Sequence, residues 1–438
     1  MKTLKKLFVA LTCAAAFSGA VFAQTSKTAD STSGLFGTDI DNFMDVTGWS
    51  SVQVDNLFLM ADSEGIGLAK QFKNFYASAY FGGEFDEFES SNKESDGTTS
   101  SNFQFNKYNF GLLFGFSNMA IKAYFSPSVT SSASGESSET TTSTGSITKT
   151  DDYAFTAGLQ YGISTNLAGK PFSQSVAIEY APNIDHRYTS SISGDATVSI
   201  ELLTSVYSLN IGSNTSWQIF SGENFTNTVK LDFIAELGII PETKTNPLES
   251  RTGAYQHNFE LVPAWITKYE NDRFKFGAKG SFYMQYFTKA DAKYVTENGV
   301  KEYTSSQTVT NMFAIVPQID IGAQFQIAKP VVFNVGTSFD LPALSWSVDH
   351  ITARDSDGTV QSETFDKTFT MNSNGASSTI KFVSGFAVNI GQHVTVDASY
   401  NILSQFDGLR WNYAGTDLWA NIGKIFFTNM TFGATLKF

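Results

Sequence analysis

The sequence predicts an all-β protein, in which one antiparallel up-and-down sheet of about 14 strands forms a single transmembrane β-barrel. Long extracellular loops and short periplasmic turns are expected to connect the strands. Three observations predict this fold: strict apolar–polar alternation in the last ten residues, repetition of that alternation along the chain, and a regular succession of short and long breaks. The charged fraction of 16% is also well below the quarter that is typical of soluble chains.

The carboxyl-terminal segment 429–438 carries the clearest alternation. Met430, Phe432, Ala434, Leu436 and Phe438 alternate with Thr431, Gly433, Thr435 and Lys437. Because successive side chains of a strand point to opposite faces, one face is apolar and the other is polar. Such a strand suits a position between hydrocarbon and a wet lumen. The last strand of a soluble sandwich could show the same alternation.

Similar segments recur from residue 75 onward, and the breaks between them alternate in length. Short breaks are expected at 117–118, 164–172, 221–224, 270–273, 329–330 and 391–392, and long ones at 90–101, 126–151, 185–196, 241–253, 289–306, 349–375 and 404–425. The count predicts fourteen strands and places Phe438 on the periplasmic side. Twelve or sixteen stay open, because 197–220 is long for one strand and its alternation slips near Tyr207. That slip suggests a bulge or a hidden hairpin. Segment 416–427 could be a separate strand or a short helix.

The amino terminus predicts export. Lys2, Lys5 and Lys6 precede an apolar run and the small-residue pattern Val21-Phe22-Ala23, which together indicate a signal peptide over 1–23. Its removal leaves a net charge of about −16 and takes away the one cysteine, Cys13. A polyanion-binding surface is therefore not expected. Residues 24–74 are expected to form a flexible leader followed by a plug or periplasmic rim segment, and residues 75–438 the barrel. Segment 65–72 could add to the first strand of that barrel.

The polar faces of the predicted strands carry charges of both signs in nearly equal number. We predict the following pore-lining residues: Lys230, Asp232, Glu236, Lys275, Lys279, Asp320, Lys381 and Asp397. A strongly selective pore would show one dominant sign, so this balance indicates a weakly selective aqueous channel. An interior closed by ion pairs is the alternative interpretation.

The remaining motifs do not predict catalysis. The run from Arg354 to Gly358 lacks the ligands of a calcium loop, and Asp357-Gly358 and Asn298-Gly299 fit hairpin turns. Asp185-His186 and Asp349-His350 are adjacent pairs, and adjacent strand residues point to opposite faces. We therefore predict no enzyme activity, no cofactor and no metal site.

Two further features concern the strands themselves. Aromatic residues near strand ends are expected to form interfacial girdles; they are Tyr161, Trp265, Tyr269, Trp346 and Tyr400. Pro263 and Pro317 fall inside strands, where a missing N–H predicts a bulge or kink.

In its leader, strand pattern and terminal phenylalanine, the chain resembles bacterial outer-membrane β-barrel proteins of the porin-like class, over 1–23 and 75–438. The resemblance implies outer-membrane localisation, contact with outer-membrane lipid, and an assembly signal at Phe438 read by the barrel-assembly machinery. Fourteen strands with a plug also resemble the long-chain fatty acid transporter family. That family's Asn-Pro-Ala motif near the mature amino terminus is absent, so its ligand-binding residues are not transferred.

The expected function is passive diffusion of small hydrophilic solutes, without a nucleic-acid partner. The alternatives are a surface-exposed adhesin or structural barrel with a closed lumen, and a plugged transporter of a hydrophobic ligand.

Overall fold

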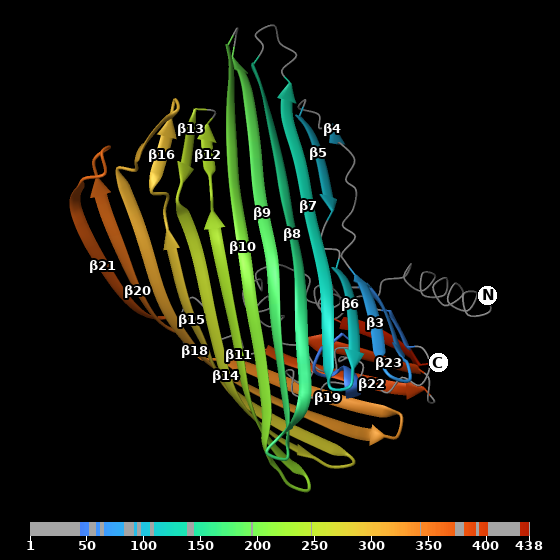
Figure 1. Cartoon of the computed structure of the whole chain (residues 1–438). Helices are drawn as coiled ribbons and strands as arrows, with labels where there is room; N and C mark the ends of the chain where they lie inside the picture. Colours follow the sequence, from blue (N-terminus) through green and yellow to red (C-terminus); the bar gives the residue numbers. More distant parts are fainter. Residues whose placement is uncertain are drawn as a thin grey trace, which may run out of the picture.

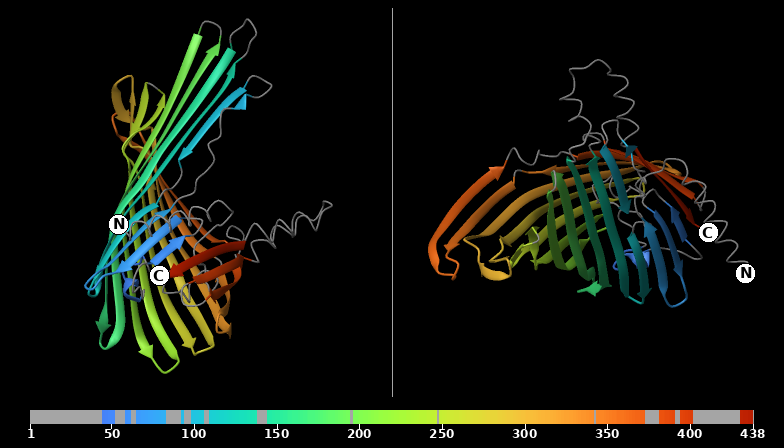
Figure 2. Two further views of the ribbon diagram at one scale, coloured as in Figure 1. Left: turned by 90° about the vertical axis from the view of Figure 1, so that its right-hand side faces the viewer. Right: turned by 90° about the horizontal axis from the view of Figure 1, so that it is seen from above.

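The computed structural model describes residues 44–51, 58–61, 65–82, 92–93, 98–105, 109–137, 144–193, 196–246, 248–341, 343–372, 381–390, 394–401 and 430–437. Within them the strands form one 24-stranded sheet, and a short 3-10 helix, η2, covers Trp49–Ser51. Sequential strands run up and down, and the sheet curves strongly when seen from above (Figures 1 and 2). The predicted fold class, an all-β antiparallel up-and-down sheet, is confirmed.

The strands have the following bounds. The first group is β1 (Phe58–Ala61), β2 (Gly65–Gln71), β3 (Tyr76–Gly82), β4 (Asn92–Lys93), β5 (Thr98–Phe105), β6 (Asn109–Phe116), β7 (Met119–Ser137) and β8 (Thr144–Leu167). The second is β9 (Lys170–Ser193), β10 (Ala196–Ser221), β11 (Phe225–Ile240), β12 (Thr243–Asn246), β13 (Glu249–Thr252), β14 (Ala254–Glu270), β15 (Phe274–Ala290) and β16 (Tyr294–Glu297). The third is β17 (Val300–Tyr303), β18 (Ser306–Ala328), β19 (Val331–Asp340), β20 (Ala343–Arg354), β21 (Val360–Asn372), β22 (Lys381–Ile390), β23 (Val394–Asn401) and β24 (Met430–Lys437).

The main ladder follows chain order. It passes through β1, β2, β3, β6, β7, β8, β9, β10, β11, β14, β15, β18, β19, β22, β23 and β24, and β24 also pairs with β1. The short turns lie at one end of this ladder, here called lower, and the hairpins β12–β13, β16–β17 and β20–β21 extend it at the other, here called upper (Figure 1). The described residues therefore give sixteen positions, the upper limit of the predicted range.

Two of those positions lie before residue 75 and add to the fourteen strands expected after it. β1 was not predicted as a strand, whereas β2 falls in 65–72, which the sequence allowed as an addition to the first strand and not as a strand of its own. β1 has only 4 residues, too few to show a period of two, and Gly65 and Gly67 interrupt the apolar pattern of β2. The sheet thus begins at Phe58.

Several predicted long loops are upward extensions of strands. β7 continues to Ser137 and β8 begins at Thr144, while β9 continues to Ser193 and β10 begins at Ala196. Polar residues on both faces hid these extensions, although Thr favours strand geometry through its branched Cβ. β7 to β10 consequently rise above the other strands (Figure 1).

β10 is one continuous strand of 26 residues. Its pairing with β9 keeps one register from Ala196 to Trp217, and its pairing with β11 shifts only between Gln218 and Phe220. The hidden hairpin predicted near Tyr207 is therefore wrong, but on the other edge the register changes by one residue there, from Tyr207–Ile239 on β11 to Thr204–Thr243 on β12, as a bulge would produce. At Pro263 the pairing with β11 keeps its register, but the pairs with β15 are interrupted at Val262 and Pro263. At Pro317 the pairing with β15 keeps its register, but on the other edge of β18 the register changes by one residue, from Ile315–Leu344 to Gln318–Asp340, which confirms the irregularity predicted there.

The tight turns explain the positions of particular residues. Asn298 and Gly299 have positive φ values of 50° and 81°, as a two-residue hairpin turn requires, which confirms that prediction. Ala168 and Gly169, with φ of 53° and 73°, close the β8–β9 hairpin within the break expected over 164–172. Gly358 follows Asp357 in the β20–β21 turn at φ 91° and donates to the Asp355 carbonyl at 2.9 Å.

Some predictions fall outside the described residues: the signal peptide 1–23, the flexible leader at the start of 24–74, the segment 416–427 and Phe438. In the described part of the chain, no helix has the length and apolar character needed to cross a membrane.

Candidate functional site

The amino-terminal turn, residues 44–51, lies against the inner face of the sheet. Its conformation follows from Asp45, whose carboxylate Oδ1 accepts hydrogen bonds from the Thr47 backbone N–H at 2.8 Å and from Thr47 Oγ1 at 2.9 Å. The Trp49 N–H donates to the Asp45 carbonyl at 3.0 Å. An Asp that accepts a hydrogen bond from the backbone two residues on forms a self-contained turn.

Wall glycines make room for the side chains of this turn. A Cβ at Gly111 would lie 2.7 Å from Met44 Cε, one at Gly115 2.6 Å from Trp49 Cε2, and one at Gly162 2.6 Å from Val46 Cγ2. Real Cβ atoms do not approach so closely. Because these three glycines of β6 and β8 have no Cβ, they leave the space that the side chains of the turn occupy.

The turn completes a buried apolar cluster. Its members are Val46, Trp49, Ala69, Tyr76, Leu113 and Ala120, all at most 5% exposed. Trp49 stacks on Tyr76 with ring centroids 5.6 Å apart. The cluster unites the turn with β2, β3, β6 and β7. Ser164 Oγ of β8 adds a hydrogen bond to the Thr47 carbonyl at 2.5 Å.

A row of polar side chains continues around the inner face from β7 to β15. Tyr124 Oη donates to Glu179 Oε1, and Asn210 Nδ2 donates to Glu179 Oε2 at 3.4 Å. Asn258 Nδ2 donates to Glu260 Oε1 at 2.8 Å and to Glu236 Oε2 at 3.5 Å, and its Oδ1 accepts from Gln285 Nε2 at 2.9 Å. We call this set the polar row.

Gly158 allows the polar row to cross β8. The cross-strand register places Gly158 between Tyr124 on β7 and Glu179 on β9. A Cβ at Gly158 would lie 2.8 Å from Tyr124 Cε2, so the tyrosine ring passes over the glycine to reach the carboxylate.

The predicted pore-lining residues occupy the same face, mostly in hydrogen bonds or ion pairs. Lys279 Nζ lies 3.1 Å from Asp320 Oδ2, and Ser338 Oγ donates to Asp320 Oδ1. Lys275 Nζ pairs with Glu270 at 3.3 Å. Asn214 Nδ2 donates to Asp232, close to Lys230 and Lys279, while Glu236 belongs to the polar row. The side chains of Lys381 and Asp397 are outside the described set, and their pore-lining role stays a prediction throughout.

Sequence reasoning missed the neutral partners in this network. Tyr124, Asn210, Asn258 and Gln285 share the inner face with the predicted charges but carry none themselves. For Tyr124, Asn258 and Gln285 the strand period was a signal, since each is an even number of residues from a charged inner-face residue of its own strand. β10 carries no charged inner-face residue, so Asn210 had no such signal.

Aromatic rings form two rows on the outer face. The upper aromatic row contains Phe259, Tyr286, Phe313, Trp346 and Phe369, which are directly opposite one another on β14, β15, β18, β20 and β21. Ring centroids are 5.9 Å apart for Phe313–Trp346 and 5.2 Å for Trp346–Phe369. The lower aromatic row contains Phe225, Tyr269, Phe274, Phe325 and Phe333, with centroids of successive rings between 5.0 and 6.4 Å apart.

The two rows enclose an apolar band. On β14, Phe259 and Tyr269 are ten residues apart, about 33 Å at roughly 3.3 Å per residue. A strand tilt of about 40° reduces that to about 25 Å. Trp265 and Phe282 lie between the rows at 51% and 54% exposure. Of the girdle residues predicted from sequence, Tyr269 and Trp346 belong to the rows, Trp265 and Tyr161 lie on the outer face, and the Tyr400 side chain is outside the described set.

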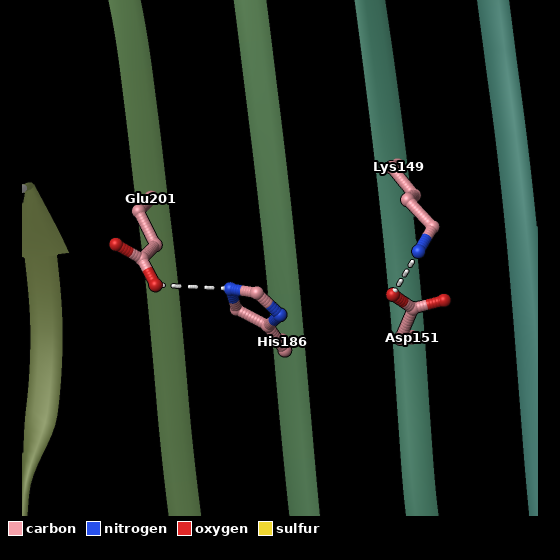
Figure 3. Close-up of polar contacts among 4 residues, drawn as sticks. All are labelled: Lys149, Asp151, His186 and Glu201. Atoms are coloured by element: carbon pink, nitrogen blue, oxygen red, sulfur yellow. Dashed lines mark hydrogen bonds and ion pairs between the residues drawn. The ribbon is translucent and has the colours of Figure 1, made fainter.

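Charged side chains stand directly above the apolar band on β8 to β10. Lys149 Nζ pairs with Asp151 at 2.7 Å, and His186 Nε2 lies 3.0 Å from Glu201 Oε1 (Figure 3). All four residues share the outer face with Tyr153, which is two residues below Asp151. The outer face of β8 therefore changes from an aromatic residue, Tyr153, to a charged one, Asp151, at the next outward-facing position.

On the inner face at the same level, two carboxylates are opposed. Asp152 and Asp185 are cross-strand partners on β8 and β9. Burial, followed by the Asp185 carboxylate, raises the pKa of Asp152 above its ordinary value. Asp185 and His186 point to opposite faces, as expected for adjacent strand residues, and His350 stacks on Phe365 with centroids 4.3 Å apart. No group of three metal-ligating side chains is found among the described residues.

Comparisons with known proteins leave the chain without an assigned family. No family model and no curated protein matches it. Among solved structures, a chain described as copper transporter OprC is similar to this one over 87% of this chain and 79% of its own, at 10% identity and a TM-score of 0.29. A TM-score this low does not establish a shared fold, so the substrate of that protein gives no argument here.

We expect Gly158→Ala to destabilise the sheet by about 1–3 kcal/mol, because the new methyl group displaces the Tyr124 ring and leaves Glu179 without its phenol. Urea unfolding of the detergent-folded protein measures the change. Gly212→Ala is the matched control, since a Cβ there would meet Ala177 Cβ at an ordinary 3.7 Å. If both variants unfold at the same urea concentration, the Tyr124 ring does not depend on the absence of a side chain at Gly158.

Asp152→Asn should stabilise the protein at neutral pH. A carboxyl whose pKa is raised in the folded state contributes most at low pH, and that contribution is lost as pH rises through the folded-state pKa. The gain from the amide should therefore be present at pH 7 and shrink toward pH 4. Unfolding midpoints across this range test it.

Asp151→Asn is the control for this comparison, because it removes the pairing with Lys149 on the opposite face. It should give no stabilisation at pH 7. A gain in both variants would show that the effect is general surface charge and not the Asp152–Asp185 pair.

Proposed function

We propose that this protein is an integral outer-membrane β-barrel of the porin-like class, through which small hydrophilic solutes diffuse passively. The observation that carries the proposal is the pair of aromatic rows, which enclose an apolar band of about 25 Å. Between the rows, the outer faces of β14, β15 and β18 carry no Asp, Glu, Lys or Arg. Lipid is the solvent that such a surface fits.

The inner face supports the solute-conducting part of the proposal. Its carboxylates and lysines are held in cross-strand contacts, as in Lys279–Asp320, so that neither sign dominates. Sixteen strands leave more space than inward side chains alone can fill, as in porin-sized barrels. An open, weakly selective lumen follows from this combination.

A surface adhesin or structural barrel with a closed lumen is the second candidate. The observation that favours it is the height of β7 to β10, which extend well above the apolar band (Figure 1). A third candidate, a plugged transporter of a hydrophobic ligand, would use the amino-terminal turn as its plug. Export by a cleaved signal peptide, and assembly through Phe438, are further parts of the proposal, as is the absence of enzyme activity.

Purified protein in a planar bilayer is expected to give discrete conductance steps in potassium chloride with weak preference for either ion. The physical reason is a water-filled lumen with balanced charge. If a folded, heat-modifiable sample gives no conductance steps, the open-channel proposal is wrong and the closed-lumen candidate is favoured.

Leu159→Arg is expected to impair membrane insertion, because Leu159 is 62% exposed on the outer face within the apolar band. An arginine at mid-depth on a lipid-facing strand costs about 2–4 kcal/mol. Gln160→Arg is the matched control, since Gln160 faces inward next to it and contacts Ser175. The heat-modifiable fraction in outer membranes measures insertion. Equal insertion of both variants would contradict the assignment of the outer face to lipid.

A further inference from the structure

The amino-terminal turn contacts one sector of the wall. Its neighbours among the described residues belong to β2, β3, β6, β7 and β8: Gly111, Gly115, Gly162, Ser164, Ser78 and the cluster around Tyr76. The polar row from Glu179 to Gln285, and the Lys279–Asp320 pair, lie on other strands further around the sheet.

The contacts on that sector have the character of a protein core. Val46 is 0% exposed and Trp49 is 5% exposed, and each fits over a glycine where any side chain would collide. Interiors packed to this degree exist in discrete arrangements and do not deform continuously. The Asp45–Thr47 hydrogen bonds also give the turn its shape without help from the wall.

We infer that the amino-terminal turn is a fixed part of the channel wall and not a movable gate, and that solutes pass along the part of the polar row on β9 to β15, from Glu179 to Gln285. This inference rests on the proposed channel function. The turn joins β2 and β3 to β6, β7 and β8 as a clasp. Asn258 and its partners, which hydrogen-bond among themselves on the inner face, then form the surface that solutes meet.

Paired cysteines test whether the turn moves. The chain has one cysteine, Cys13, so a Cys13→Ser background is free of thiols. Met44→Cys with Ser78→Cys joins the turn to β3 at a point where the two side chains are in contact, and oxidation then locks it. We expect the oxidised and reduced forms to conduct equally, with a ratio near one. A several-fold rise in conductance on reduction would overturn the inference, and so would failure of the pair to oxidise.

Single cysteines test the route. Asn258→Cys should react with a charged methanethiosulfonate added to the open channel, and the current should fall by a measurable step. Leu113→Cys is the control, because Leu113 is 0% exposed beneath the turn and should stay unmodified in the same chain background. If the cysteine of Leu113→Cys reacts as fast as that of Asn258→Cys, the inference that the turn is fixed is wrong.

The two proposals fail in different ways. If the unsubstituted protein gives no current, the channel function fails, while disulfide formation and the thiol reactivity of Leu113→Cys still report on the turn. If current is present but depends on the disulfide, the proposed channel function is supported and the inference that the turn is fixed is wrong.

Discussion

Every other feature depends on the continuous pairing of main-chain groups between neighbouring strands. An unpaired N–H or C=O is costly away from water, so a sheet placed in lipid must satisfy these groups internally. The pairing of β1 with both β2 and β24 matters for this reason, because it gives the carboxyl-terminal strand a partner on each side. Four residues of β1 thus contribute more to the architecture than their length suggests.

Once the ladder fixes the register, the two faces can differ completely. On β14 and β15 the outer face carries Phe259, Trp265 and Phe282, and the inner face carries Asn258, Glu260 and Gln285. A slip of one residue would exchange these sets. The polar row and the aromatic rows therefore stabilise the same register from opposite sides, the first through hydrogen bonds and the second through contact with lipid.

Glycine acts differently on the two faces. At Gly115 and Gly162 the inner wall receives the rings and methyl groups of the amino-terminal turn, and at Gly158 it lets Tyr124 reach Glu179. Gly280, with nothing within 4 Å of its ideal Cβ, receives no partner. Composition alone does not distinguish these cases, since only the cross-strand neighbours show which glycine has a large side chain above it.

The sequence predicted what local periodicity can reveal, and it missed what depends on neighbours. The faces of β11, β15 and β18 followed from alternation, as did hairpin turns such as Asn298-Gly299. β1 escaped detection because 4 residues hold too little of a period, and it is recognised only through β24. Of the inner-face residues, the charged ones could be chosen by type. Their partners Tyr124 and Asn210 could not, because a neutral side chain gains its role from the strand beside it.

β10 shows how alternation changes along one continuous strand. From Trp217 up to Tyr207 its outer residues belong to the apolar band, and the next charged outer position is Glu201, which contacts His186. At and above that level Val198, Ile200 and Leu202 alternate with Thr197, Ser199 and Glu201, so the apolar residues stand at even positions instead of odd ones. The strand nevertheless continues to Ala196, because its main chain still pairs with β9 at every residue. Pairing sets how far a strand extends, while the solvent on each side sets which residues it carries, and only the second is written as a pattern in the sequence.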